Sequence, residues 1–148
     1  MTVDERVLAI DYGERRVGMA VSDPTYGYVR GLPTIDRREL TASLFEAIAD
    51  VVGEEEIDRI VIGIPYTLEG TEGKAARQVR SFAGDLASQI DIPIDEWDER
   101  LTSEAARRAL REAGHDERAI RTKVDQLSAV LMLEGYLRLR ARQEEGPE

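Results

Sequence analysis

The segment from Val7 to Asp23 reads V-L-A-I-D-Y-G-E-R-R-V-G-M-A-V-S-D. Its two apolar runs are separated by glycine and charged residues, a pattern that predicts a β-hairpin. Asp11 follows the first run, at the point where a buried strand opens to solvent. A carboxylate there is costly to bury unless a cation meets it, although Asp also commonly caps its own turn. The hairpin alone leaves both interpretations of Asp11 open.

The composition predicts a single domain without disulfides. The chain has 148 residues, enough to bury a core, and it contains no cysteine. No apolar run approaches the roughly 20 residues that a membrane span needs. The first residues, M-T-V-D-E-R, are acidic and lack the basic-then-apolar order of a signal peptide. We therefore expect a soluble cytoplasmic protein that does not act on membranes.

The charge balance is unusual for a protein that binds phosphates. Thirty acidic residues against twenty basic ones give a net charge of −10, whereas phosphate-binding surfaces are basic. Lys74 and Lys123 are the only lysines, so the other basic residues are arginines. An acidic, lysine-poor composition is what we expect of a protein that works in concentrated salt. Because arginine binds phosphate bidentately, a locally basic site remains compatible with this composition.

The rest of the chain alternates predicted strands and helices. Strands are expected over 28–35, 59–64 and 92–97, and helices over 39–52, 74–90, from 102 or 103 to 114, and 123–142. A charged connection is expected over 116–122, and a disordered acidic tail over 143–148. This order, β-β-β-α-β-α-β-α-α, indicates an α/β domain with a mixed five-stranded sheet flanked by helices. Ligands of such sheets gather at strand ends, so Asp11 and Glu99 are expected to be able to meet there.

Four collinear segments resemble the YqgF family of RNase H-like nucleases. They are I-D-Y-G-E-R-R-V-G-M-A-V-S-D (10–23), I-V-I-G-I-P-Y-T-L-E-G-T-E-G (60–73), W-D-E-R-L-T-S-E-A (97–105) and K-V-D-Q-L-S-A-V-L-M-L-E-G-Y-L (123–137). The resemblance covers nearly the whole chain. It implies an RNase H-like fold in residues 1–142 and a nuclease that either resolves Holliday junctions or matures pre-16S rRNA, the second role slightly favoured. Thr67 stands where the family usually has Asn, which puts the nucleic-acid contact of that amide in doubt here.

The resemblance assigns catalysis and metal binding to three carboxylates, Asp11, Glu99 and Asp125. Phosphodiester hydrolysis needs a nucleophile near neutral pH and stabilisation of the leaving oxygen, which two divalent ions roughly 4 Å apart supply. Carboxylate oxygens suit Mg²⁺ or Mn²⁺, so we expect two such ions and in-line attack by water. Taken singly, Asp125 also fits a favourable charge at a helix N-terminus, and Glu99 a surface ion pair with Arg100.

Nucleic-acid contacts are predicted around the glycine-containing loop that precedes the 74–90 helix. Its backbone amides and the helix N-terminus suit phosphate, although an ordinary turn with a solvated basic face explains the same pattern. It is not a P-loop, because Leu68 and Ala75 occupy positions where that motif requires Gly and Ser or Thr. The candidates for nucleic-acid binding are Arg15, Arg16, Thr67, Gly70, Gly73, Lys74, Arg77, Arg100 and Lys123.

Two other functions fit parts of the pattern. A non-catalytic module with the same fold could act by contact on ribosomes or transcription machinery, although all three carboxylates are present. A strand that ends in D-x-G also occurs in actin/Hsp70-like ATPases, which normally close two such domains over ATP. The expected partner is nucleic acid, either precursor rRNA or branched DNA, and the sequence does not choose between a monomer and a homodimer.

Overall fold

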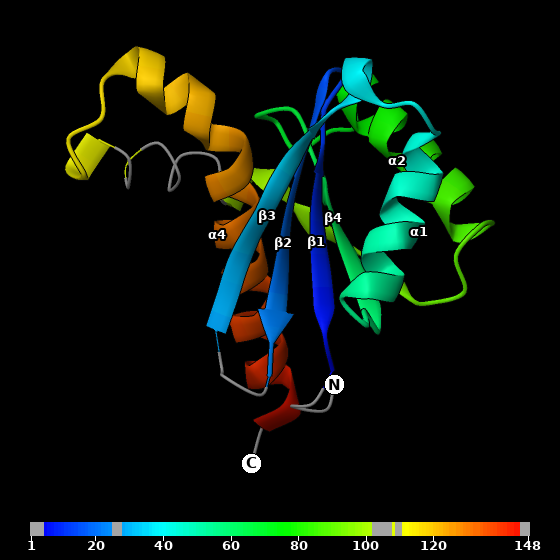
Figure 1. Ribbon diagram of the computed structural model, residues 1–148. Coiled ribbons are helices and arrows are strands. Elements are labelled where there is room, and N and C mark those ends of the chain that lie inside the picture. The colour runs from blue at the N-terminus through cyan, green and yellow to red at the C-terminus, as the bar shows by residue number, and fades with distance from the viewer. Residues whose placement is uncertain (1–4, 25–27, 102–107, 109–110, 146–148) are drawn as a thin grey trace.

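The computed structural model describes residues 5–24, 28–101, 108 and 111–145, without side chains at 117–126 and 144–145. A five-stranded sheet in the order β3-β2-β1-β4-β5 forms its centre (Figure 1). The strands are β1 (Val7–Tyr12), β2 (Arg16–Asp23), β3 (Tyr28–Asp36), β4 (Arg59–Ile64) and β5 (Ile94–Asp98). β1, β2 and β3 pair antiparallel, whereas β4 is parallel to both β1 and β5. The predicted mixed sheet is confirmed.

Helices cover both faces of the sheet. α1 (Leu44–Glu54) and α2 (Lys74–Ala87) lie on one face, and α4 (Glu117–Glu145) lies on the other (Figure 1). Because successive side chains of a strand point to opposite faces, β1 contributes to two cores. Leu8 and Ile10 pack in the core beneath α1 and α2, and Val7 and Ala9 pack in the core beneath α4.

Several element boundaries differ from those predicted. α1 begins at Leu44 because the Ser43 side chain accepts a hydrogen bond from the Glu46 amide and caps the helix. The expected connection over 116–122 is wrong, since α4 already begins at Glu117. α4 also runs to Glu145, three residues into the predicted tail, whereas 146–148 lie outside the described residues. Most of the helix predicted to end at 114 lies outside them as well.

A polar cluster ties the C-terminal half of α4 to β5. The Asp95 carboxylate accepts hydrogen bonds from the Tyr136 hydroxyl and, at 3.1 Å, from Arg140 Nη1. Arg59 Nη1 lies 3.4 Å from the same carboxylate. Burial, followed by the hydrogen bond to Asp95, raises the pKa of Tyr136 to about 12. This cluster fixes α4 along the sheet, which matters because the same helix carries position 125. No helix in the described part of the chain is long and apolar enough to cross a membrane.

Candidate active site

Asp11 and Glu99 meet on the α4 side of the sheet. Asp11 lies near the end of β1, and Glu99 opens the 3₁₀ turn η2 (Glu99–Leu101) directly after β5. A side-chain hydrogen bond joins the two carboxyl groups. Asp11 follows Ala9 by two residues and therefore points to the face that α4 covers. The structure thus brings together two of the three carboxylates that the sequence analysis singled out.

Gly63 on β4 makes this meeting sterically possible. A Cβ atom at position 63 would lie 2.6 Å from both Cγ and Oε1 of Glu99, so the Glu99 side chain crosses directly over the glycine. The pairing of Ile10 with Ile62 places Gly63 one residue beyond, between β1 and β5 in the sheet. Sequence reasoning missed this residue. The signal was an isolated glycine inside a β-branched run, which often marks a close approach.

The Asp11–Glu99 pair holds a proton in the absence of a cation. Burial, followed by the negative charge of Asp11 and the hydrogen bond to it, raises the pKa of Glu99 to about 9. Two carboxylates held this close repel each other once both are ionised. A divalent cation bound by their oxygens relieves that repulsion, and oxygen donors are those that Mg²⁺ and Mn²⁺ prefer. The pair therefore fits a metal site of this kind.

The third predicted ligand is not placed by the structure. Asp125 and Lys123 belong to α4, but their side chains lie outside the described residues. Within the described residues, no three His, Cys, Asp or Glu side chains gather as a possible metal site. Ala129, four residues after Asp125, is fully buried in the core between α4 and the sheet. A small residue there lets the helix approach the sheet closely.

Arg100 forms an ion pair with Asp98. The surface ion pair between Arg100 and Glu99, which was one interpretation of Glu99, is therefore not observed. The Arg100 guanidinium binds Asp98, with Nε 3.0 Å from Oδ1 and Nη2 2.5 Å from Oδ2. This contact holds the pKa of the Asp98 carboxyl below its usual value. Arg100 also lies over the ring of Tyr66 and packs against Gly70, whose φ is +82°. Arg100 therefore fixes the 65–73 loop beside the end of β5.

The 65–73 loop is closed by threonine. Thr67 Oγ1 accepts a hydrogen bond from the Thr71 amide at 3.1 Å and lies 2.6 Å from Thr71 Oγ1. Thr67, at the position where the resemblance leads us to expect Asn, therefore braces its own loop. The loop packs on Gly73, where a Cβ would come within 3.1 Å of the Thr67 methyl group.

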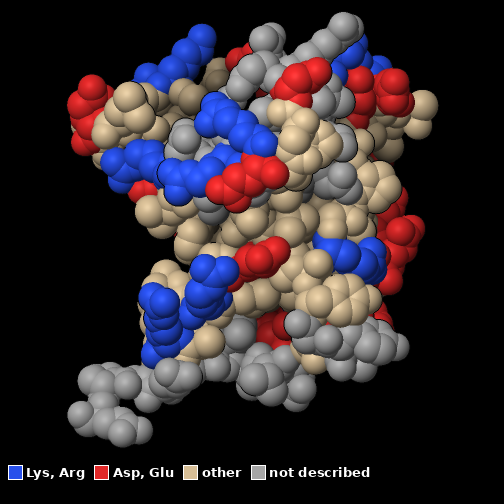
Figure 2. Space-filling view, turned by 90° about the vertical axis from the view of Figure 1, so that its left-hand side faces the viewer, with Lys and Arg blue, Asp and Glu red and all other residues tan. Residues whose placement is uncertain are grey.

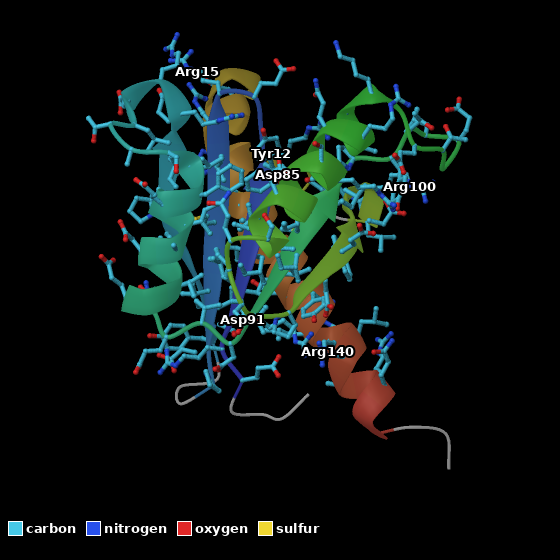
Figure 3. All side chains as sticks on the ribbon, turned by 90° about the vertical axis from the view of Figure 1, so that its right-hand side faces the viewer. Tyr12, Arg15, Asp85, Asp91, Arg100 and Arg140 are labelled. Carbon is cyan, nitrogen blue, oxygen red and sulfur yellow. The ribbon has the colours of Figure 1, made fainter. Side chains whose placement is uncertain are left out.

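The remaining predicted nucleic-acid contacts fall into two groups. Arg15 forms an ion pair with Asp36 at 3.6 Å. Arg16, Lys74 and Arg77 are exposed, and none has a carboxylate partner among the residues that the structure describes. Arg15 and Arg100 lie toward the end of the sheet that carries Asp11 and Glu99, whereas Asp91 and Arg140 lie toward the opposite end (Figure 3).

Comparison with known proteins identifies the family of this chain. The family model for the RuvX Holliday junction resolvase matches residues 5–139. The chain belongs to this family, which is the YqgF family that the sequence resembles. A relative from Koribacter versatilis is 39% identical over 98% of this chain and 94% of its own length. One from Moorella thermoacetica is 39% identical over 89% of this chain and 94% of its own. Both relatives carry, as a provisional name, pre-16S rRNA nuclease.

A solved structure confirms the fold. T. thermophilus RuvC, solved in complex with a Holliday junction substrate, superposes on this RuvX-family chain with a TM-score of 0.52. The match covers 91% of this chain and 96% of RuvC at 15% sequence identity. The RNase H-like architecture predicted from the sequence is therefore confirmed.

Proposed function

We propose that this protein is a divalent-metal-dependent nuclease that hydrolyses phosphodiester bonds in structured nucleic acid. The observation that carries this proposal is the pair formed by Asp11 and Glu99, which are joined by a hydrogen bond at the strand ends beneath α4. Asp125, four residues before the buried Ala129, is the third carboxylate of the proposed site. When bound, two Mg²⁺ or Mn²⁺ ions generate a nucleophile near neutral pH and stabilise the leaving oxygen.

The protein's own residues hold and orient this site. Gly63 leaves the space in which Glu99 lies, and the tie between Arg100 and Asp98 fixes the turn that carries Glu99. Arg16, Lys74 and Arg77 are exposed cations, which we infer contact the phosphates of a bound strand. The names of the relatives favour precursor 16S rRNA as the substrate, with branched DNA as the alternative. The rRNA role also implies action in the cytoplasm, where ribosomes are assembled.

Cleavage by the purified protein tests the proposal. A labelled 5′-extended 16S rRNA precursor and a four-way DNA junction are incubated with Mg²⁺ or Mn²⁺ at low and at molar KCl. Asp11→Asn removes one proposed ligand and should lower cleavage by at least about 10²-fold, whereas EDTA should abolish it. Asp91→Asn is the matched control, because Asp91 is exposed and lies toward the opposite end of the sheet (Figure 3).

The outcomes distinguish the substrates and the alternative function. Cutting of the precursor alone assigns the rRNA role, and cutting of the junction alone assigns the resolvase role. If the folded protein cuts neither substrate at either salt concentration, the nuclease proposal fails. The non-catalytic binding module then explains the chain better, above all if Asp11→Asn also supports normal ribosome maturation in cells.

A further inference from the structure

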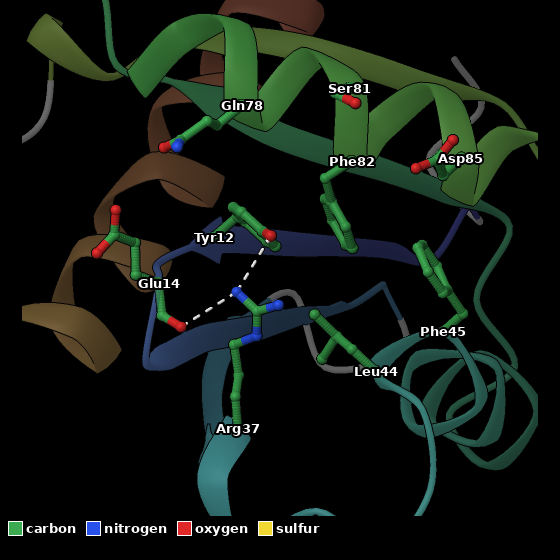
Figure 4. Close-up of a pocket in the computed structure, with 9 residues that line it drawn as sticks. All are labelled: Tyr12, Glu14, Arg37, Leu44, Phe45, Gln78, Ser81, Phe82 and Asp85. Carbon is green, nitrogen blue, oxygen red and sulfur yellow. Dashed lines mark hydrogen bonds between the residues drawn. The ribbon is translucent and has the colours of Figure 1, made fainter. Parts of the chain in front are cut away.

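A cavity of about 470 Å³ lies on the face of the sheet opposite Asp11. Its walls come from the end of β1, the hairpin turn, the 3₁₀ turn η1 (Arg37–Glu39), α1 and α2 (Figure 4). Cavities of this size in proteins hold small organic molecules. The residues that line it are Tyr12, Glu14, Arg37, Leu44, Phe45, Gln78, Ser81, Phe82 and Asp85.

Arg37 gives the cavity one well-held positive charge. Its Nη1 donates to the Tyr12 hydroxyl and to the carbonyls of Gly13 and Glu14, each at 3.1 Å, and its guanidinium lies over the Tyr12 ring. Among the described residues, no carboxylate forms an ion pair with Arg37, and its Nε and Nη2 have no hydrogen-bond partner. The Glu14 carboxylate points away from it (Figure 4). The unused edge of the guanidinium is the fork that binds an oxyanion bidentately.

The wall opposite Arg37 is formed by α2, which presents hydrogen-bonding side chains to the cavity (Figure 4). Gln78, Ser81 and Asp85 follow one another on α2 at spacings of three and four residues and therefore share a face. The row spans about 10 Å along the helix. None of the three side chains has a hydrogen-bond partner among the described residues. They are suited to the hydroxyl, amino and carbonyl groups of a polar ligand.

The floor of the cavity is aromatic. The Tyr12 and Phe82 rings are stacked with their centroids 4.2 Å apart, and Phe45 lies 5.6 Å from Phe82 at the same interplanar angle of 20°. Because the faces of these rings are turned toward one another, the row presents ring edges to the cavity, and the face of a planar ring packs favourably against such edges. One fixed cation, a row of hydrogen-bonding groups and an aromatic floor together match a phosphate, a ribose and a base.

We propose that this cavity binds a nucleoside monophosphate, either free or as the 5′-terminal nucleotide of a strand. The phosphate binds the open edge of Arg37, the base packs on the aromatic floor, and Gln78, Ser81 and Asp85 bind the ribose and the base edge. Polyphosphates are disfavoured, because Arg37 is the one basic residue among the lining residues and Asp85 is acidic. The site is separate from the Asp11–Glu99 pair, since Tyr12 and Asp11 point to opposite faces.

Calorimetric titration tests this site independently of nuclease activity. The Asp11→Asn variant is titrated in EDTA with AMP, GMP, CMP and UMP, with adenosine and inorganic phosphate as partial ligands. At least one monophosphate should bind with a dissociation constant below about 1 mM, with the partial ligands at least tenfold weaker. Comparing 5′-phosphorylated with 5′-hydroxyl RNA trinucleotides separates a strand end from a free nucleotide: binding of the phosphorylated form assigns the strand end.

Two substitutions locate the binding. Ser81→Trp fills the cavity from an exposed helix position and should abolish binding, whereas Ala87→Trp, exposed on the same helix outside the cavity, should leave it unchanged. Arg37→Lys should weaken binding about tenfold, because it keeps the charge and loses the fork. Since Arg37 also holds the hairpin turn, the decisive variant is Ser81→Trp. The proposal is overturned if no monophosphate binds saturably, or if Ser81→Trp binds as tightly as the parent protein.

Discussion

The side chain of Glu99 lies across the backbone of Gly63 and reaches Asp11. The position of the Glu99 carboxyl group therefore depends on the absence of a side chain at position 63. Gly63→Ala places a methyl group 2.6 Å from the Glu99 side chain, which must swing away from Asp11. We expect a loss of cleavage of about 10²-fold, because small misplacements of reacting groups are costly. The free energy of unfolding should change little, since the displaced atoms all belong to the Glu99 side chain and no backbone atom is among them. Gly84→Ala, with open space around it, should retain full activity; equal activity of both variants would contradict this dependence.

Glu99 also makes the metal-free protein sensitive to pH. Its pKa is about 9 in the folded state, against an ordinary value of 4.5, so the folded protein binds a proton that the unfolded chain releases. Stability in EDTA should therefore fall as pH rises from about 4.5 to about 9. Glu99→Gln removes this dependence and should be more stable than the parent at pH 8 by about 1 to 3 kcal/mol.

Urea unfolding between pH 5 and pH 9 measures this effect. Added Mg²⁺ should stabilise the parent protein more than Glu99→Gln, because the ion takes the place of the proton. Glu69→Gln, at an exposed position of the 65–73 loop, controls for the loss of a carboxylate. Parallel pH profiles for the parent and Glu99→Gln in EDTA would refute the shared proton.

At the scale of elements, the strands were predictable, whereas most helix ends were not, the start of α2 at Lys74 being an exception. The run of apolar residues in 59–64 defines β4 because a strand covered on both faces is apolar throughout. The meeting of Asp11 with Glu99 followed from the rule that strand ends converge at one edge. The start of α4 at Glu117 was missed because its first turns are rich in charge and carry no clear apolar face. The cavity beside Arg37 was missed because it depends on how α1 and α2 pack together.

α4 is held against β5 at Gly135. A Cβ at this position would lie 3.1 Å from Cζ2 and 3.2 Å from Cη2 of Trp97. Gly135→Val should therefore push the helix away from the sheet and lower the free energy of unfolding by about 1 to 3 kcal/mol. The loss should occur although valine has a higher helix propensity than glycine. Because α4 carries Asp125, the affinity for Mn²⁺ should fall as well.

Denaturant unfolding and Mn²⁺ titration of Gly135→Val check this prediction. Ala141→Val, exposed further along α4, reports the cost of valine in this helix without contact to the sheet. If Gly135→Val unfolds at the same urea concentration as Ala141→Val, close packing at Gly135 does not hold the helix in place.

For the whole molecule, the net charge of −10 coexists with a proposed activity on polyanions. On the side of the molecule that lies at the left of Figure 1, basic side chains have acidic neighbours and do not form one continuous basic surface (Figure 2). Some arginines are neutralised by an adjacent carboxylate, as in the ion pair between Arg30 and Glu55 at 2.6 Å. The acidic residues outnumber the basic ones, so many carboxylates repel one another, and this repulsion destabilises the folded state at low salt.

Salt should consequently stabilise this protein. We expect the urea midpoint to rise between 0.05 and 1 M KCl, because the Debye length shortens from roughly 14 Å to about 3 Å and screens the repulsion. Glu54→Lys changes the net charge from −10 to −8 and places a cation at the C-terminus of α1, four residues after Asp50. Glu54→Lys should raise the urea midpoint at low salt, because the lysine interacts favourably with the helix dipole and with Asp50. It should also reduce the increase in midpoint that KCl produces. A midpoint that stays level or falls in molar KCl would show that this acidic surface is not adapted to concentrated salt.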